Sequence, residues 1–185
     1  ATTGELTNGE STAITVAITD DAAALPAGAY YCDIAFTNTT DGAGDTTRRV
    51  VLCLGDMEQQ FTWTFDTDPG WTTESAWAFR EPTGQGGQYG FPDPSSGHTG
   101  ENVYGYNLAG DYSNNMPEYH LTTTAIDCSD LYSVELRFWR WLGVEQPAYD
   151  HAYVRVSNNG SDWTTVWANT VEVTDSHWIE VSYDL

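Results

Sequence analysis

The sequence predicts an all-β chain, because its residue patterns and its composition both favour strands. Apolar and polar residues alternate over residues 134–142 and 151–157, which is the period of a half-buried strand. Aromatic residues make up 14% of the chain, and aromatic and β-branched side chains are enriched in sheets. No long segment shows the 3.6-residue apolar period of an amphipathic helix. We therefore expect little helix.

The first part of the chain reads as three strands, over residues 10–18, 28–37 and 49–54. A hairpin symmetric about the loop between the last two would place Cys32 opposite Cys53, where a cross-strand disulfide is geometrically reasonable. Such a bond indicates an oxidising, extracytoplasmic compartment, so we expect a secreted protein. The alternative is a pair of buried thiols.

A further strand is expected over Phe61–Phe65, followed by a turn that carries two carboxylates. Asp66 and Asp68 stand just before Pro69-Gly70, an arrangement that suits a hard cation with oxygen ligands. Both residues are candidate Ca²⁺ ligands. The alternative is an ordinary turn, because short Asp-x-Asp sequences are common turn formers.

The segment of residues 134–142 is expected to show one apolar and one polar face. Its alternation assigns Val134, Leu136, Phe138 and Leu142 to the first face, and Glu135, Arg137, Trp139 and Trp141 to the second. Arg140 falls on the apolar face. A lone guanidinium there is costly to bury, so we expect it to pair with a carboxylate, with Glu145 and Asp150 nearest in sequence.

The next strand, 151–157, is expected to turn at Asn159-Gly160 into a two-residue type I′ hairpin. That register places Val156 against Trp163, Val154 against Thr165, and Ala152 against Trp167. Both tryptophans then lie on the apolar face, and we expect them in the core, where aromatic cross-strand pairs stabilise sheets.

The net charge of the chain limits the classes of partner that it can bind. It holds 27 acidic residues against six basic ones, all arginine, for a formal net charge of −21. This balance argues against binding to nucleic acid or to anionic membranes and makes a cation a more natural partner. The sequence contains no apolar run of membrane-spanning length, so we expect no membrane insertion.

Two resemblances add to this interpretation. The run GESTAITVAITDDAAALPAGAYYCDIAFTNTTDGAGDTTRRVVLCL, within residues 4–54, resembles the latter half of the BACON-like immunoglobulin-like repeats of large secreted bacterial proteins. From residue 61 onward, FDTDPGWTTESAWAFREPTG, GHTGENVYGYNLAGDY and LTTTAIDCSDLYSVELRFWRWLGVEQPAYDHAYVRVSNNGSDW resemble the MAM-like jelly-roll modules of secreted subtilisin-type and immune-inhibitor-A-type proteases.

The resemblances imply a partial immunoglobulin-like β-sandwich over 1–56 and a jelly-roll β-sandwich over 57–185, truncated at its C-terminus. They also imply a role for Glu145 and Asp150. In the resembled modules the acidic residues at these places belong to a loop suited to holding Ca²⁺ or to fixing the strand crossover. A structural pair with Arg140 or His151 is the alternative. Cys128 is left without a mate, so it is either a thiol with an external partner or a small buried hydrophobe.

The sequence offers little support for catalysis. It contains no HExxH, no GxSxG, no Cys/His zinc spacing and no phosphate-binding glycine loop that opens a helix. A glycosidase pair such as Glu145 and Asp150 is expected by chance among 27 acidic residues. We therefore expect a chain that is not an enzyme.

Two non-catalytic roles remain. Outward-facing aromatic residues can stack on sugar rings or contact a protein; the candidates are Trp139, Trp141, Tyr104, Tyr106 and Tyr153. The alternative is that a second sheet or the neighbouring domain covers them. The first role is an accessory module of a larger multidomain secreted protein that binds a glycan or protein surface. The second is an assembly subunit whose unpaired strands are completed by neighbouring copies.

Overall fold

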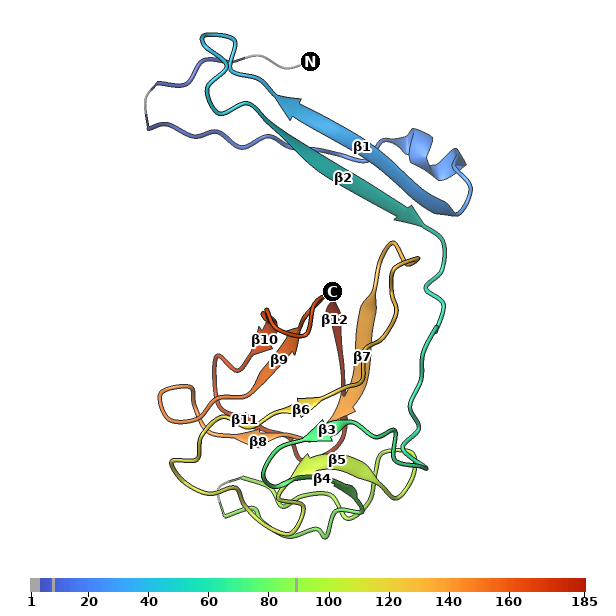
Figure 1. Cartoon of the computed structure of the whole chain (residues 1–185), viewed down its shortest axis with the longest axis vertical. Coiled ribbons are helices and arrows are strands. Elements are labelled where there is room, and N and C mark those ends of the chain that lie inside the picture. The colour runs from blue at the N-terminus through green and yellow to red at the C-terminus, as the bar shows by residue number, and fades with distance from the viewer. Residues whose placement is uncertain (1–3, 8, 89) are drawn as a thin grey trace. The chain divides into compact units, whose positions relative to one another are not determined.

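The computed structural model describes residues 4–7, 9–88 and 90–185, and the chain divides into two compact units, Ala1–Met57 and Glu58–Leu185 (Figure 1). Nearly all regular structure is β-strand, and a single short 3₁₀ turn, η1 (Asp20–Ala24), is found among the described residues. The all-β prediction is confirmed. No helix in the described part of the chain is long and apolar enough to cross a membrane.

The first unit is built on one hairpin. Strands β1 (Gly28–Phe36) and β2 (Thr46–Leu54) pair antiparallel along their full length, from Phe36 opposite Thr46 to Gly28 opposite Leu54. The predicted strand over residues 10–18 is wrong: these residues belong to no ladder, and all of them are exposed. A segment with this alternating pattern forms a strand only when a neighbouring strand is present to pair with it.

The predicted opposition of Cys32 and Cys53 is also wrong. Cys32 lies opposite Val50, and Cys53 lies opposite Ala29. Because Cys32 and Ala29 are an odd number of positions apart, the two thiols point to opposite faces of the hairpin. No disulfide joins them in this structure. The Asn38 side chain sets the register, because it closes the loop with hydrogen bonds to Asp41 (2.7 Å) and to the Ala43 carbonyl (3.0 Å).

The second unit is an antiparallel β-structure of short strand pairs. The pairs are β3–β6, β4–β5, β7–β12, β8–β11 and β9–β10. The strands span Thr72–Thr73 (β3), Trp77–Arg80 (β4), Val103–Tyr106 (β5), Leu121–Thr122 (β6), Glu135–Arg140 (β7), Gly143–Val144 (β8), Tyr153–Val156 (β9), Thr164–Ala168 (β10), Val173–Thr174 (β11) and Ile179–Asp184 (β12). The predicted strand Phe61–Phe65 joins no ladder in the described structure.

The interior of the second unit is mainly aromatic. Val103, Leu108 and Val144 are its buried aliphatic residues. In addition, Phe65, Trp71, Phe79 and Tyr104 form edge-to-face, tilted and stacked ring contacts with centroids 5.1–6.1 Å apart. Gly105 is required at its position, because a Cβ there would lie 2.2 Å from Leu108 Cδ2. The glycine thus lets Leu108 pack directly over β5.

The predicted faces of β7 are confirmed for five of its six residues. Leu136, Phe138 and Arg140 are half-buried and Arg137 and Trp139 are exposed, but Glu135, which was assigned to the polar face, is also half-buried. Arg140 pairs with a carboxylate, but the partner is Asp175, just ahead of β12, instead of Glu145 or Asp150. The sequence-nearest carboxylates are not the spatial neighbours, because β7 pairs with β12 at the far end of the chain.

The hairpin after β9 differs from the prediction. Val156 lies opposite Thr164, and Val154 lies opposite Trp167 after a bulge. Type I′ geometry requires a positive φ at both central residues, yet only Gly160 (71°) has one here.

Side-chain hydrogen bonds build this turn in place of the predicted two-residue hairpin. The Asn159 side-chain oxygen, Oδ1, accepts from the backbone N–H groups of Ser161 and Asp162, each at 2.8 Å, which lengthens the turn. Trp163 therefore falls outside β10 and is 47% exposed instead of buried, while Trp167 is half-buried as expected.

Candidate functional site

The candidate site is an aromatic cluster on β7 and at the adjoining ends of β7 and β12, which we call the Trp139 face. It consists of Trp139, Trp141 and Trp178, with His98 stacked upon it. Trp139 projects from the outward side of β7 and is 42% exposed. Trp141 and Trp178 meet edge to face at a centroid distance of 5.8 Å. His98 lies 6.3 Å from Trp178 between ring centroids, and this contact connects the Trp141–Trp178 pair to Trp139.

His98 covers one side of Trp139. Its imidazole lies parallel to the indole, with centroids 3.7 Å apart and an interplanar angle of 7°. The tight turn that carries His98 depends on Gly97, where a Cβ would lie 2.7 Å from the Asn102 carbonyl oxygen and 2.8 Å from the Gly100 carbonyl oxygen. The Gly97 N–H donates to the Glu101 carbonyl (3.0 Å) and closes this turn. Much of the indole stays open to solvent despite this contact.

Charged groups border the Trp139 face. Glu180 lies directly opposite Trp139 on β12. Arg137, one pleat away, donates to Glu135 at 2.8 Å and lies 4.0 Å from Glu180. The bond to Glu135 raises the pKa of the already strongly basic Arg137. The face thus combines a flat apolar surface with fixed hydrogen-bond donors and acceptors.

Tyr104 and Tyr106, two of the predicted ligand-binding residues, lie together on β5 but make different contacts from the Trp139 face. Tyr104 stacks on Trp71 at 5.1 Å and donates its hydroxyl proton to Asp68 (2.5 Å). Tyr106 packs against Trp77 and Tyr119. Both tyrosines are half-buried and contribute to packing.

Tyr153 belongs to a third set of contacts. It is 38% exposed on β9, stacks on His151 at 5.8 Å and lies under the Arg155 guanidinium at 4.2 Å. The ring contacts therefore divide the five predicted aromatic residues into three groups. Of these groups, the Trp139 face contains two predicted residues and two that sequence reasoning did not single out, His98 and Trp178.

The predicted cation ligands Asp66 and Asp68 lie on the turn after Phe65. Asp66 accepts from the Thr64 hydroxyl (2.8 Å), and Asp68 accepts from the Gly70 N–H (2.8 Å) as well as from Tyr104. The Tyr104 bond, followed by that from Gly70, lowers the pKa of Asp68, so this carboxylate stays ionised. The turn is thus held by its own side chains.

The predicted pair Glu145 and Asp150 brackets the loop between β8 and β9, and Asn169 holds this loop in place. The Asn169 amide donates to the carbonyls of Glu145 and Asp150, each at 3.1 Å, and its oxygen accepts from Ala152 N–H (2.9 Å). Asn169 is only 5% exposed. The only sequence signal for the anchoring role of Asn169 is its position as a polar residue directly after the apolar end of β10.

Tyr112 contacts the same loop from another segment. Its hydroxyl donates to the Asp150 carboxylate at 2.7 Å. Burial, together with this hydrogen bond, raises the pKa of Tyr112 to about 12. In the described chain, no group of three or more His, Cys, Asp or Glu side chains is arranged to hold a metal ion.

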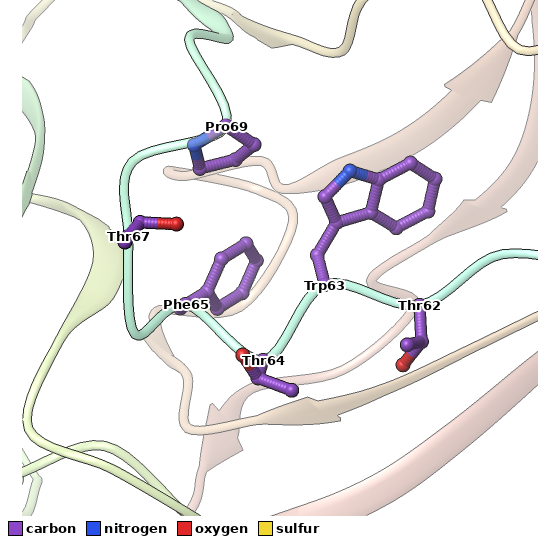
Figure 2. Close-up of a pocket in the computed structure, with 6 residues that line it drawn as sticks. All are labelled: Thr62, Trp63, Thr64, Phe65, Thr67 and Pro69. Carbon is purple, nitrogen blue, oxygen red and sulfur yellow. The ribbon is translucent and has the colours of Figure 1, made fainter.

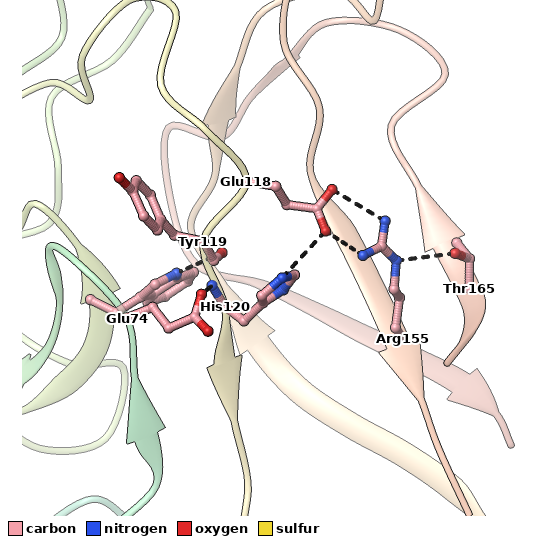
Figure 3. Close-up of polar contacts among 7 residues, drawn as sticks. Glu74, Glu118, Tyr119, His120, Arg155 and Thr165 are labelled. Carbon is pink, nitrogen blue, oxygen red and sulfur yellow. Dashed lines mark hydrogen bonds and ion pairs between the residues drawn. The ribbon is translucent and has the colours of Figure 1, made fainter. Parts of the chain in front are cut away.

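A polar network joins β9 to the segment before β6 (Figure 3). Arg155 forms a two-point contact with the Glu118 carboxylate, and its Nε lies 3.4 Å from the Thr165 hydroxyl. His120 Nε2 is 3.6 Å from the Glu118 carboxylate, and the His120 backbone N–H donates to the Glu74 carboxylate (3.0 Å). The Arg155 bond lowers the pKa of Glu118. The network ties strand pairs together, and nothing in the local sequence pattern predicted it.

One carboxylate has a strongly altered acidity. Burial, with a smaller effect of the nearby Asp111 charge, raises the pKa of Asp93 to about 6. Asp111 is itself held by the N–H groups of Gly87 (2.9 Å) and Gln88 (3.3 Å). The Asp111 carboxylate therefore ties the glycine-rich segment around Gly87 to the residues that follow β5.

Cys128 is half-buried and forms no disulfide in this structure. The comparisons with known proteins identify no relative: no protein family, curated protein or solved structure matches the chain.

Proposed function

We propose that this chain is a non-catalytic accessory module of a larger secreted protein and binds a glycan surface through the Trp139 face. In this proposal the first unit is part of an immunoglobulin-like sandwich, and the second is a jelly-roll sandwich, as the sequence resemblances imply. The observation that carries the proposal is the 42% exposure of Trp139 beside fixed polar groups on a paired strand.

The chemistry of the Trp139 face suits a sugar. The C–H face of a pyranose packs on an indole ring, and its hydroxyls need donors and acceptors at the rim. Arg137 and Glu180 supply both kinds of group next to Trp139. Because β7 and β12 pair over six residues, the platform is held rigid before the ligand arrives.

A protein surface is the alternative ligand. Two tryptophan variants test whether the Trp139 face binds a glycan. Trp139→Ala should abolish retention on immobilised polysaccharides in affinity electrophoresis. Trp163→Ala removes a similarly exposed indole (47%) that lies just before β10 and is not part of the Trp139 face, so it should leave retention unchanged. Absence of retention by any polysaccharide, or equal losses in the two variants, would contradict the glycan proposal.

The proposal includes stabilisation by Ca²⁺, with Asp66 and Asp68 or Glu145 and Asp150 as ligands. Carboxylate and carbonyl oxygens are the donors that Ca²⁺ prefers, and the excess of acidic over basic residues favours a cation nearby. A cation that binds only the folded state raises the melting temperature, so chelation should lower it. An unchanged melting temperature after chelation would contradict this part of the proposal.

The second candidate function is a structural subunit of an extracellular assembly. It is favoured by residues 11–18, which are exposed throughout, with Ile14 at 53%, Val16 at 56% and Ile18 at 71%. Such alternating apolar side chains next to unpaired backbone invite strand pairing with another molecule. Light scattering on the purified chain tests this function, because a strict monomer at every concentration would oppose it.

A further inference from the structure

Residues 61–65, Phe-Thr-Trp-Thr-Phe, are a strand-like segment without a strand partner. They alternate in direction, with Thr62 and Thr64 pointing to one side and Trp63 and Phe65 to the other (Figure 2). No backbone–backbone hydrogen bond involves residues 58–69 among the described residues. Trp63 is nevertheless anchored, since its ring contacts Trp71 edge to face at 5.6 Å.

A hollow of about 340 Å³ lies along this segment, lined by Thr62, Trp63, Thr64, Phe65, Thr67 and Pro69. Consecutive residues with side chains on both sides line it, so the hollow follows the backbone edge and does not sit beneath one face. The segment ends at Phe65, whose φ of 61° takes the chain out of the extended region. An open edge of this kind is where another strand docks.

The sequence of the segment reads the same in both directions, and it carries no charge. Antiparallel pairing of two copies about a two-fold axis at Trp63 would therefore place Trp63 opposite Trp63 of the second copy. Thr62 would then lie opposite Thr64 of the second copy, and Thr64 opposite Thr62. Each aromatic or threonine side chain meets its own kind, and such cross-strand pairs stabilise a sheet.

We propose that the edge of residues 61–65 is a dimerisation site, at which two copies of this chain pair antiparallel through a two-fold axis at Trp63. A self-complementary patch of this kind closes a dimer and stops there, because the same surface is used by both partners. The pairing is independent of glycan binding, since it shares no residue with the Trp139 face.

Charge opposes the dimer outside the paired segment. Glu58 precedes the paired segment and Asp66 and Asp68 follow it, so antiparallel pairing brings carboxylates of the two copies toward each other, and each chain has a formal net charge of −21. Salt screens these repulsions. Dimerisation should therefore strengthen as the NaCl concentration rises, which distinguishes it from association through ion pairs.

Sedimentation equilibrium over a range of protein and NaCl concentrations measures the association of the full chain. Thr62→Asp with Thr64→Asp places like charges opposite each other and should raise the dimer dissociation constant about tenfold or more. Thr62→Arg with Thr64→Asp places opposite charges across the two-fold axis and should restore association. Thr37→Asp with Thr39→Asp adds the same charges at the same spacing on exposed residues of the first unit and serves as the control.

Hydrogen exchange at concentrations that favour the dimer should show protection of every second amide within residues 61–65, because alternate N–H groups of a strand point to the same neighbour. A monomer under every condition would overturn the proposal. So would a dimer that the paired aspartates leave intact, a failure of the Arg/Asp combination to restore it, or protection at residues 11–18 in place of 61–65.

Discussion

The Arg140 guanidinium donates two hydrogen bonds to the Asp175 carboxylate, from Nε to Oδ2 at 3.0 Å and from Nη2 to Oδ1 at 3.3 Å. The same carboxylate accepts from the Leu142 N–H at 2.9 Å, and Arg140 also lies 5.2 Å from the Trp167 ring centre. The pair therefore links the end of β7 to the segment before β12 and to β10.

Breaking this pair should destabilise the protein. Asp175→Ala leaves a guanidinium that is only 19% exposed without its carboxylate, and we expect a loss of about 3 kcal/mol in the free energy of unfolding. Urea denaturation measures it. The control is Arg137→Ala at a pair whose arginine is 59% exposed, where the loss should stay below about 1 kcal/mol. Similar losses in both variants would show that burial does not set the strength of the Arg140 pair.

Asn169 should prove essential to the loop between β8 and β9. Asn169→Ala removes the partner of two carbonyls and one N–H, and unsatisfied buried groups make a loss of about 3 kcal/mol the expected result. Thermal unfolding followed by circular dichroism tests this. Asn159→Ala, at an exposed turn, should cost less than about 1 kcal/mol. An equal effect at both positions would rule out the anchoring role.

Asp93 should make the protein less stable as pH rises. Its folded pKa of about 6 lies above the ordinary value of 3.8, so between these values the folded state binds more protons than the unfolded state, and stability falls across this window. Asp93→Asn should be the more stable protein above about pH 6. Because Asp93 is only half-buried, solvent screening limits the gain to about 1 kcal/mol.

Asp68 provides a control of opposite sign for the pH experiment. Its pKa is lowered by Tyr104 and Gly70, so its contribution is present above the unfolded pKa and is lost as pH falls through the folded one. Asp68→Asn should therefore lower the melting temperature at neutral pH. If Asp93→Asn behaves in the same way, the interpretation of Asp93 is wrong.

The cysteines should remain thiols. Titration of the protein unfolded without reductant should find three reactive thiols, and a reducing agent should leave the melting temperature unchanged. The reason is the β1–β2 register, which directs Cys32 and Cys53 to opposite faces. A thiol count of one, together with a fall in melting temperature on reduction, would mean that the hairpin pairs differently.

Features that depend only on residues close together in the sequence could be predicted. The inward set Leu136, Phe138 and Arg140 follows from the two-residue period of a strand, which requires no knowledge of the partner. The need of Arg140 for a carboxylate follows from its place on that face. Both predictions use only the chemistry of neighbouring residues, and both are confirmed.

Features that depend on register could not be predicted in the same way. The partner Asp175 is 35 positions from Arg140 and is brought near only by the β7–β12 pairing. Ser157 and Asn159 rebuild their turn with side-chain hydrogen bonds, so a rule based on Asn-Gly alone misplaced Trp163. Among the site residues, His98 was missed because its stacking on Trp139 depends on a distant turn around Gly97.

The anchoring of both ends of the β8–β9 loop by Asn169 has a practical consequence. The tip of this loop, including Tyr149 at 67% exposed, lies outside those anchoring bonds. Foreign peptide grafted between Gln146 and Tyr149 would open the turn in which the Gln146 carbonyl accepts from the N–H groups of Tyr149 (2.9 Å) and Asp150 (3.2 Å). It would leave the Asn169 bonds at both ends of the loop in place, and added loop length carries a small entropic cost. The loop is therefore a natural place to display an epitope or an affinity tag without altering the strands on either side.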